Sequence, residues 1–122
     1  MNNKKLIIRS SGKQKRDYIY VDDVSRAYYK LYKYLSNSSA KLKIYNIGSK
    51  YNLTTIQIVK KIYSIMNKKT NYVIKNYSKS EIKNQRLNYK KIIRELKWRP
   101  LFNLDESISI TVDWYKKYYF NN

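Results

Sequence analysis

Apolar residues recur at helical spacing in the first third of the chain, directly after the aspartates of "YVDDV". The residues that share one face of this predicted helix are Val24, Ala27, Tyr28, Leu31 and Leu35. Such spacing is typical of an amphipathic helix. Asp22 or Asp23 is predicted to cap its start, because a carboxylate there accepts unpaired backbone N–H groups and faces the positive end of the helix dipole.

A second helix is predicted after "YNLTTIQ", where Thr54 and Gln57 have the spacing of a capping box and Leu53 is placed to act as a hydrophobic staple. The residues expected on its buried stripe are Val59, Ile62, Tyr63 and Met66. The stripe predicts a helix that packs one face on the core.

The C-terminal part of the chain predicts two more helices. A short one would be capped by Asn88 and run through Leu96, ending ahead of Pro100. The last would begin at Asn103, which forms a capping box with Glu106. Its core face is predicted to comprise Leu104, Ile108, Val112, Tyr115 and Tyr119.

Short runs of β-branched and aromatic residues lie between these helices. They predict strands at residues 6–9, 18–21, 43–49 (ending at Gly48) and 71–74, with a possible short strand at 85–88. Residues 37–41 and 75–84 are predicted loops. The expected fold class is therefore α/β, a small mixed lobe of short strands and about four helices, with residues 1–122 forming a single domain.

The composition excludes several kinds of chemistry. The chain has no Cys and no His, which excludes disulfides, thiolate chemistry, histidine acid–base catalysis and ordinary zinc sites. No apolar run is long enough to span a membrane, and the N-terminal segment does not resemble a secretory signal. We therefore expect a cytoplasmic protein without a membrane partner.

The formal net charge of +19 admits two interpretations. A strongly basic chain is typical of a module that binds RNA or DNA. However, Lys, Asn, Ile and Tyr are over-used together, as A/T-rich codons would produce, and the 21 Lys are scattered along the chain against only 6 Arg. Compositional drift is the favoured interpretation and nucleic-acid binding the alternative.

No catalytic residue can be assigned from the pattern alone. The two glycines, Gly12 and Gly48, do not form the glycine-rich turn of a dinucleotide site or of a Walker loop. Tyr29 and Lys33 have Tyr-x-x-x-Lys spacing, but a chain so rich in both residues contains about two or three such pairs by chance. The paired carboxylates begin predicted helices, which explains them without catalysis.

Four segments together resemble a known family. "GKQKRDYIYVDDVSRAYY", "YNIGSKYNLTTIQIVKKI", "EIKNQRLNYKKIIRELKWRP" and "LDESISITVDWYK" resemble, in order and spacing, the C-terminal third of the extended short-chain dehydrogenases/reductases, the NAD-dependent epimerases and dehydratases of nucleotide sugars. Within the family, "EIKNQRLN" before "LKWRP" looks most like the CDP-glucose 4,6-dehydratases, with GDP-mannose and dTDP-glucose dehydratases and UDP-sugar epimerases close behind.

The resemblance implies a substrate-binding lobe without the Rossmann half, which in the family holds NAD and the catalytic residues. Arg16 would reach the substrate's diphosphate, and Asn46 would lie at the edge of the nucleotide pocket. Gln85 or Arg86 would face the nucleotide, and Lys83 or Arg86 would replace a second phosphate-binding arginine. The implied ligand is a nucleotide-diphosphate sugar. The Rossmann half would be a separate chain, or this chain would be an inactive remnant.

Physical chemistry supports this assignment in part. A guanidinium can hold two phosphate oxygens at once, which suits Arg16 to a diphosphate. Asp17 could orient that guanidinium or could hydrogen-bond the backbone. Each candidate also has a structural interpretation: an ion-paired surface arginine for Arg16, a strand-end amide for Asn46, and a solvated loop for residues 85–86.

Overall fold

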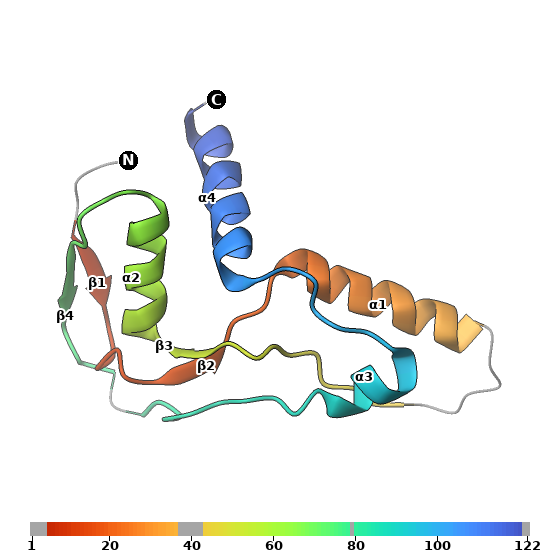
Figure 1. Ribbon diagram of the computed structural model, residues 1–122. Helices are drawn as coiled ribbons and strands as arrows, with labels where there is room; N and C mark the ends of the chain where they lie inside the picture. Colours follow the sequence, from red (N-terminus) through yellow and green to blue (C-terminus); the bar gives the residue numbers. More distant parts are fainter. Residues whose placement is uncertain (1–4, 37–42, 79, 121–122) are drawn as a thin grey trace.

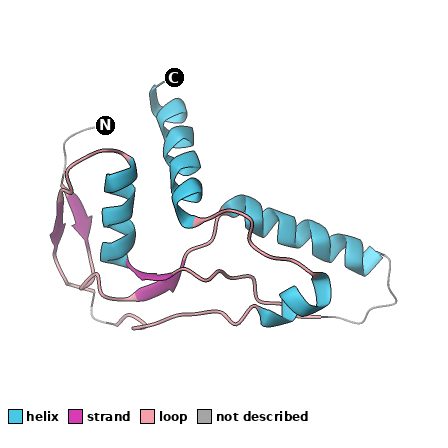
Figure 2. Cartoon of the chain, viewed as in Figure 1, coloured by secondary structure: helices cyan, strands magenta, loops and turns pink. Residues whose placement is uncertain are grey.

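The computed structural model describes residues 5–36, 43–78 and 80–120 (Figures 1 and 2). Within them the elements follow in the order β1 Leu6–Ile8, β2 Lys15–Asp17, α1 Val21–Ser36, β3 Asn52–Thr54, α2 Thr55–Ile65, β4 Tyr72–Ile74, α3 Lys90–Leu96 and α4 Leu104–Phe120. The predicted class, a small α/β lobe of short strands and about four helices, is confirmed for the described residues.

The strands form two separate pairs. β1 and β4 are parallel, with Leu6 opposite Tyr72, and β2 and β3 are antiparallel, with Arg16 opposite Leu53. The β1 and β4 predictions were correct to within one residue at each end. Each pair is short, so the fold depends on the helices and on side-chain hydrogen bonds to loops.

Both predicted capping boxes are present. At α2 the Thr54 hydroxyl accepts from the backbone N–H of Gln57, and the Gln57 side chain accepts from the N–H of Thr54. At α4 Asn103 and Glu106 exchange the same pair of bonds at 2.9 and 3.0 Å. Reciprocal caps of this kind fix where a helix begins, because they satisfy backbone donors that have no partner inside the helix.

The prediction of a strand at residues 18–21 was wrong. The strand ends at Asp17 and α1 begins at Val21, so the aromatic run "YIY" is a connection. The Tyr18 N–H still donates to the Tyr51 carbonyl at 3.0 Å, and the Ser49 hydroxyl donates to the Tyr18 carbonyl at 2.6 Å. A side chain therefore replaces the next rung of the ladder and the chain turns into α1.

The strands predicted at 43–49 and 85–88 were also wrong. Both segments run without regular secondary structure, and the nearest ladder contact is a single bridge between Lys15 and Asn84. Residues 43–49 have strand composition, yet among the described residues no strand pairs with them. The predicted loop at 37–41 lies outside the described residues.

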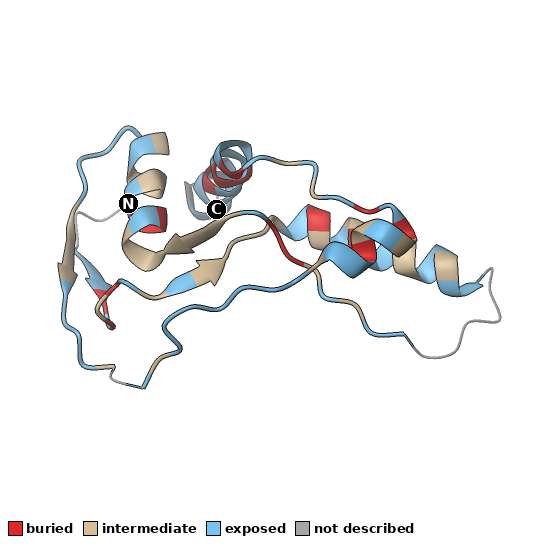
Figure 3. Cartoon of the chain, turned by 60° about the horizontal axis from the view of Figure 1, so that its bottom comes forward, coloured by how far each residue is buried: buried red, intermediate tan, exposed pale blue. Residues whose placement is uncertain are grey.

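One core cluster lies where α1 crosses α3. Its buried members are Ala27, Ile92, Leu96 and Trp98. In α1 the inward face runs through Ala27 and Leu31, whereas Tyr28 and Leu35, predicted to be core, are exposed. A helix packed on the short α3 buries only a narrow stripe, so the edge positions of the predicted face remain outside (Figure 3).

Asp23 does not cap α1, contrary to prediction. Both Asp22 and Asp23 lie inside the first turn, and Asp23 is buried, with its side chain 1 % exposed. Its carboxylate accepts the backbone N–H groups of Leu101 and Phe102 at 2.8 and 3.3 Å, and its carbonyl accepts the Trp98 indole N–H. The residue thus ties the start of α1 to the loop that precedes α4.

The second core cluster joins α2 and α4, which stand side by side in Figure 1. Its buried members are Ile58, Leu104, Ile108 and Val112, with Ile62 and Met66 partly buried against them. Tyr115 and Tyr119 were predicted to be core, but they are 45 % and 65 % exposed. The last turns of α4 extend past this cluster, where none of the described elements faces them.

Candidate functional site

A polar seam runs along the outer edge of β2, and we define it as residues 82–88 together with the facing side of β2. The backbone of Lys15 makes two hydrogen bonds to the seam. Its N–H donates to the Lys83 carbonyl at 2.9 Å, and its carbonyl accepts the Gln85 N–H at 3.0 Å. β2 is therefore hydrogen-bonded on both edges, to β3 on one side and to the seam on the other.

Arg16, the predicted diphosphate ligand, lies at the start of this seam. One terminal nitrogen of its guanidinium donates to the carbonyls of Lys15 and Ile82 at 2.8 and 2.7 Å. The other lies 3.7 Å from a carboxylate oxygen of Glu81. The side chain is about one-third exposed. The two carbonyls fix the guanidinium while leaving N–H donors toward Glu81 and solvent.

Asp17 does not orient Arg16. Its carboxylate accepts the Leu87 N–H at 2.8 Å and the Asn52 amide at 3.3 Å, so of the two predicted roles the backbone one is confirmed. The Asn52 amide also donates to the Gln85 carbonyl at 2.9 Å. Asp17 and Asn52 together hold residues 85–87 against the two strands.

Asn46 contacts the other end of the seam. Its side-chain amide donates to the Asn88 carbonyl at 3.3 Å. Gly48 permits this approach, because an added Cβ would lie 3.2 Å from Leu87 Cβ and 3.3 Å from the Asp17 carboxylate. Residues 46–48 therefore lie directly beside residues 87–88, although the two segments are far apart in sequence.

The five predicted site residues are thus brought to one seam but not to one point. Arg16, Lys83 and Gln85 lie at its beginning, and Asn46 contacts its end. The side chains of Lys83, Gln85 and Arg86 are exposed. Arg86 borders a hollow of about 490 Å³ that Asn88, Lys90 and Ile93 also line.

Sequence reasoning gave no site role to Glu81 and Asn52, and it predicted Asn88 only as the cap of α3, whereas the N-cap of α3 is Tyr89. Glu81 is the acid nearest Arg16, Asn52 holds the seam to β3, and Asn88 accepts from Asn46 and, through its side chain, from the Lys90 N–H. One signal was available for Glu81: it is one of only eight acids and stands within a basic loop. Asn52 gave none, because asparagine is abundant throughout the chain.

A clasp of four side chains holds the segment that leads to Asn46. Lys43 donates to the Tyr34 hydroxyl at 2.6 Å and lies 3.5 Å from Glu95, which accepts the Tyr45 hydroxyl at 2.8 Å. The hydrogen bond from Tyr45 lowers the pKa of Glu95. The pKa of Tyr45 is raised, mainly by burial and to a lesser extent by the same hydrogen bond. The bond to Tyr34 raises the pKa of Lys43. The clasp therefore favours charged Glu95 and Lys43.

Comparisons with known proteins agree on one family. The sequence profile of the NAD dependent epimerase/dehydratase family matches residues 1–48. Human dTDP-D-glucose 4,6-dehydratase is 29 % identical across 98 % of this chain. The structure of Thermotoga maritima UDP-glucose 4-epimerase with UDP-glucose is 30 % identical over 94 % of it, with a TM-score of 0.80. The chain is therefore similar to the NAD-dependent epimerases and dehydratases over nearly its whole length.

The chain spans only about a third of its relatives' length. It covers 35 % of the human dehydratase and 36 % of the Thermotoga epimerase. It likewise covers 35 % of Bacillus anthracis dTDP-glucose 4,6-dehydratase, whose structure is a complex with NAD, at 25 % identity and a TM-score of 0.75. The chain therefore corresponds to a part of these enzymes.

The described residues contain no glycine-rich turn of the kind that holds a dinucleotide. A dinucleotide cradle places glycines at a turn that opens a helix, so that backbone N–H groups reach the pyrophosphate. Gly12 lies in the β1–β2 connection and Gly48 in the extended segment before Ser49, and neither precedes a helix. The starts of α2 and α4 are closed by their own capping boxes.

Among the described residues, no helix is long and apolar enough to cross a membrane.

Proposed function

We propose that this chain is the nucleotide-sugar-binding part of an NAD-dependent 4,6-dehydratase or epimerase. It would hold the diphosphate and nucleotide, and the redox chemistry would be performed by the two-thirds of the family fold that the chain does not cover. The observation that carries the proposal is the polar seam, because it gathers the residues predicted for substrate binding onto one continuous edge of β2.

Arg16 is suited to the diphosphate by its geometry. The carbonyls of Lys15 and Ile82 pre-organise the guanidinium, so little side-chain freedom is lost on binding. Its free donors can hold two phosphate oxygens. Glu81 occupies that side in the absence of ligand, so a phosphate would displace a weak, partly exposed ion pair.

The nucleotide would then lie along the seam toward Asn46 and Asn88. Arg86 and Lys90 give the adjoining hollow a positive charge, which suits the second phosphate or the ribose edge. Exposed amides at Gln85 and Asn46 offer both donors and acceptors to a base. CDP-glucose is our preferred substrate on sequence grounds, and dTDP- and UDP-glucose are the nearest alternatives.

Isothermal titration of the chain with CDP-, dTDP- and UDP-glucose at physiological salt tests this function. We expect saturable binding to one of them, and Arg16→Ala should weaken it by about 10-fold or more, because a hydrogen bond to a charged group contributes about 1.5–3 kcal/mol. Glu81→Gln should tighten it. Arg94→Ala is the matched control, since Arg94 is exposed and pairs with the neighbouring Glu95.

Two results would contradict the proposal. One is equal binding by the wild type and Arg16→Ala. The other is turnover of any of these sugars with NAD by the purified chain, because the chain would then own catalytic residues that we have not assigned.

Nucleic-acid binding remains the alternative prediction, and the same samples distinguish it. A charge-driven RNA complex would weaken steeply with salt and would be nearly independent of sequence. If RNA bound in this manner while no nucleotide sugar bound at any salt concentration, the net charge and not the seam would account for the chain's activity.

A further inference from the structure

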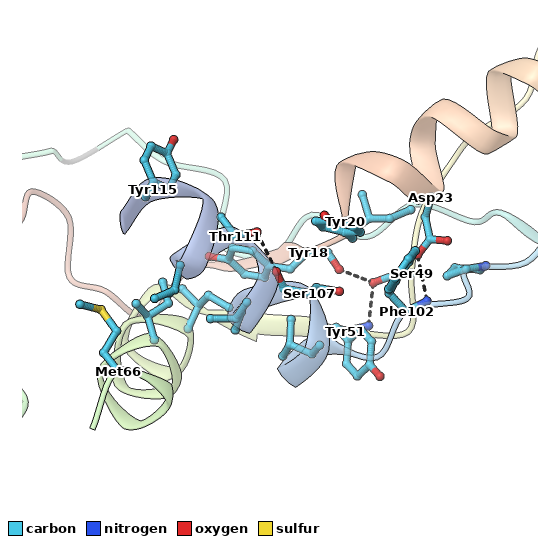
Figure 4. Close-up of a pocket in the computed structure, with 17 residues that line it drawn as sticks. Tyr18, Tyr20, Asp23, Ser49, Tyr51, Met66, Phe102, Ser107, Thr111 and Tyr115 are labelled. Atoms are coloured by element: carbon cyan, nitrogen blue, oxygen red, sulfur yellow. Dashed lines mark hydrogen bonds between the residues drawn. The ribbon is translucent and has the colours of Figure 1, made fainter. Parts of the chain in front are cut away.

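An apolar groove separates α2 from α4, and none of the five predicted site residues lines it. The cavity measures about 420 Å³. We define the α2–α4 groove by six of its lining residues: Ile58, Ile62 and Met66 of α2 and Ile108, Val112 and Tyr115 of α4. Figure 4 shows Met66 on one wall and Thr111 and Tyr115 on the other. The walls are the second core cluster, seen from its uncovered side.

Three hydroxyls that line the groove are already bonded within the chain. The Ser107 hydroxyl donates to the Asn103 carbonyl at 2.6 Å, and the Thr111 hydroxyl donates to the Ser107 carbonyl at 2.7 Å. Ser49 bonds the Tyr18 carbonyl. A small-molecule site normally combines apolar walls with a few polar groups directed at the ligand. Here the Ser107 and Thr111 hydroxyls bond back into their own helix, which leaves a mostly apolar wall on the α4 side.

The form of its walls restricts what can fill the groove. The two walls defined above are helices, whose backbone groups are bonded internally, so a strand entering between them would find no partner on either wall for its own N–H and C=O groups. The non-helical residues 18–20, Pro100 and Phe102 line another part of the cavity. A helix carries its backbone hydrogen bonds with it. Only its apolar stripe would need to fit between α2 and α4, as in helix–helix packing.

We propose that the α2–α4 groove seats an amphipathic helix from the part of the epimerase/dehydratase fold outside this chain. The proposal rests on the proposed function, in which the chain is one part of a divided enzyme. Two observations favour this occupant. The chain superposes on about a third of the Thermotoga epimerase with a TM-score of 0.80, so the walls of the groove belong to the shared fold and the other two-thirds is available to cover them. A second copy is disfavoured by the net charge of +19 on each molecule.

Single-cysteine mapping tests the proposal cleanly, because the chain has no cysteine. Ile62→Cys and Tyr115→Cys place a thiol on each wall, and Ile44→Cys is the control, since Ile44 is 75 % exposed and outside the groove. The probes are overlapping peptides of about 20 residues, about 30 Å long as a helix. They tile the part of Thermotoga maritima UDP-glucose 4-epimerase that this chain does not match.

We expect one amphipathic peptide to slow the reaction of both groove thiols with a thiol reagent by about 10-fold. It should leave the thiol at position 44 unchanged and gain helical circular dichroism on binding, because such a peptide is only marginally helical alone. Using two wall positions protects the test against one variant that fails to fold.

Four outcomes would overturn the proposal. Either no peptide protects the groove thiols, or protection is equal at position 44. Protection that increases with chain concentration in the absence of peptide would indicate a second copy, and protection by decanoate but by no peptide would indicate a small apolar ligand. Nucleotide-sugar titration of the same samples separates the two proposals. Retained sugar binding without peptide protection removes only the helix, and peptide protection without sugar binding removes only the proposed function.

Discussion

The α1–α3 cluster and the α2–α4 cluster are built from similar apolar residues, yet only the first is closed. Trp98 and Ala27 are fully inaccessible, and Asp23 seals the cluster by bonding the loop that passes over it. The buried residues of the second cluster each retain slight exposure and border the open α2–α4 groove. On its exposed side Lys61 pairs with Asp105, a surface contact that joins the two helices at one point.

The difference shows that the α1–α3 half of the lobe closes its core with residues of this chain, whereas the α2–α4 half does not. A buried polar residue with all its partners present specifies one arrangement, because any other leaves a charge unpaired. The open half has apolar walls, and its buried Ser107 hydroxyl bonds only the Asn103 carbonyl at the start of its own helix, so among the described residues no buried polar contact there fixes α2 against α4. We therefore expect substitutions in the two regions to have very different effects on stability.

Trp98→Ala should give the largest effect. Replacing a fully buried tryptophan with alanine removes its packing and leaves a cavity, which costs about 3–5 kcal/mol. Urea denaturation followed by circular dichroism measures the loss. Trp98→Phe, which keeps a ring, should recover part of it, and an effect below about 1 kcal/mol would show that this cluster is as open as the other.

Asp23→Asn should cost about 1–3 kcal/mol, since the amide keeps one acceptor and directs an N–H group at the backbone donors of Leu101 or Phe102. The neighbouring Asp22→Asn is the control. Asp22 is exposed in the same helical turn and should lose at most about 1 kcal/mol of dipole interaction. Equal effects of the two substitutions on the denaturation midpoint would rule out the sealing role of Asp23.

Met66→Gln should change the free energy of unfolding by less than about 1 kcal/mol, because a partly exposed side chain at the groove loses little burial. Glutamine and methionine also have similar helix propensities. The measurement is the same urea curve. A loss of more than about 2 kcal/mol would mean that the groove is closed in solution.

The clasp gives a smaller effect that depends on pH. The pKa of Glu95 is lowered from its ordinary value of 4.5, so the clasp stabilises the fold above that pH and the stabilisation is lost as the pH falls through the folded pKa. Between about pH 6 and about pH 3, the melting temperature of the wild type should therefore decrease more than that of Glu95→Gln. Parallel decreases would indicate that the clasp contributes nothing measurable.

Local chemistry made part of this fold predictable. The capping boxes at Thr54 and Asn103 placed two helix starts, because their partners are three residues away. The strand at 43–49 was predicted on composition and was wrong, since a strand exists only where another strand pairs with it. Tyr115 and Tyr119 follow the apolar stripe of α4, but their burial depends on an element that would have to face them.

The candidate site was predictable only through the family resemblance. Motif position singled out Arg16 and Asn46, and the structure added what holds each of them. The carbonyls around Arg16, the Glu81 carboxylate and the Asn52 bridge are contacts between segments distant in sequence, which no single-sequence pattern encodes. Whether these residues bind a nucleotide sugar stays a prediction for the titration to decide.

The two bonded aspartates of "RDYIYVDD" also restrict how this lobe can change over evolution. Asp17 accepts the backbone N–H of Leu87, and Asp23 accepts that of Leu101. The segment from Leu87 to Leu101 therefore has to keep a length that matches the distance between the two carboxylates, which lie only six residues apart in sequence. We therefore anticipate that insertions and deletions accumulate ahead of Ile82, in the connection after β4, and are rare between Leu87 and Leu101, where the α3 turn sets the distance.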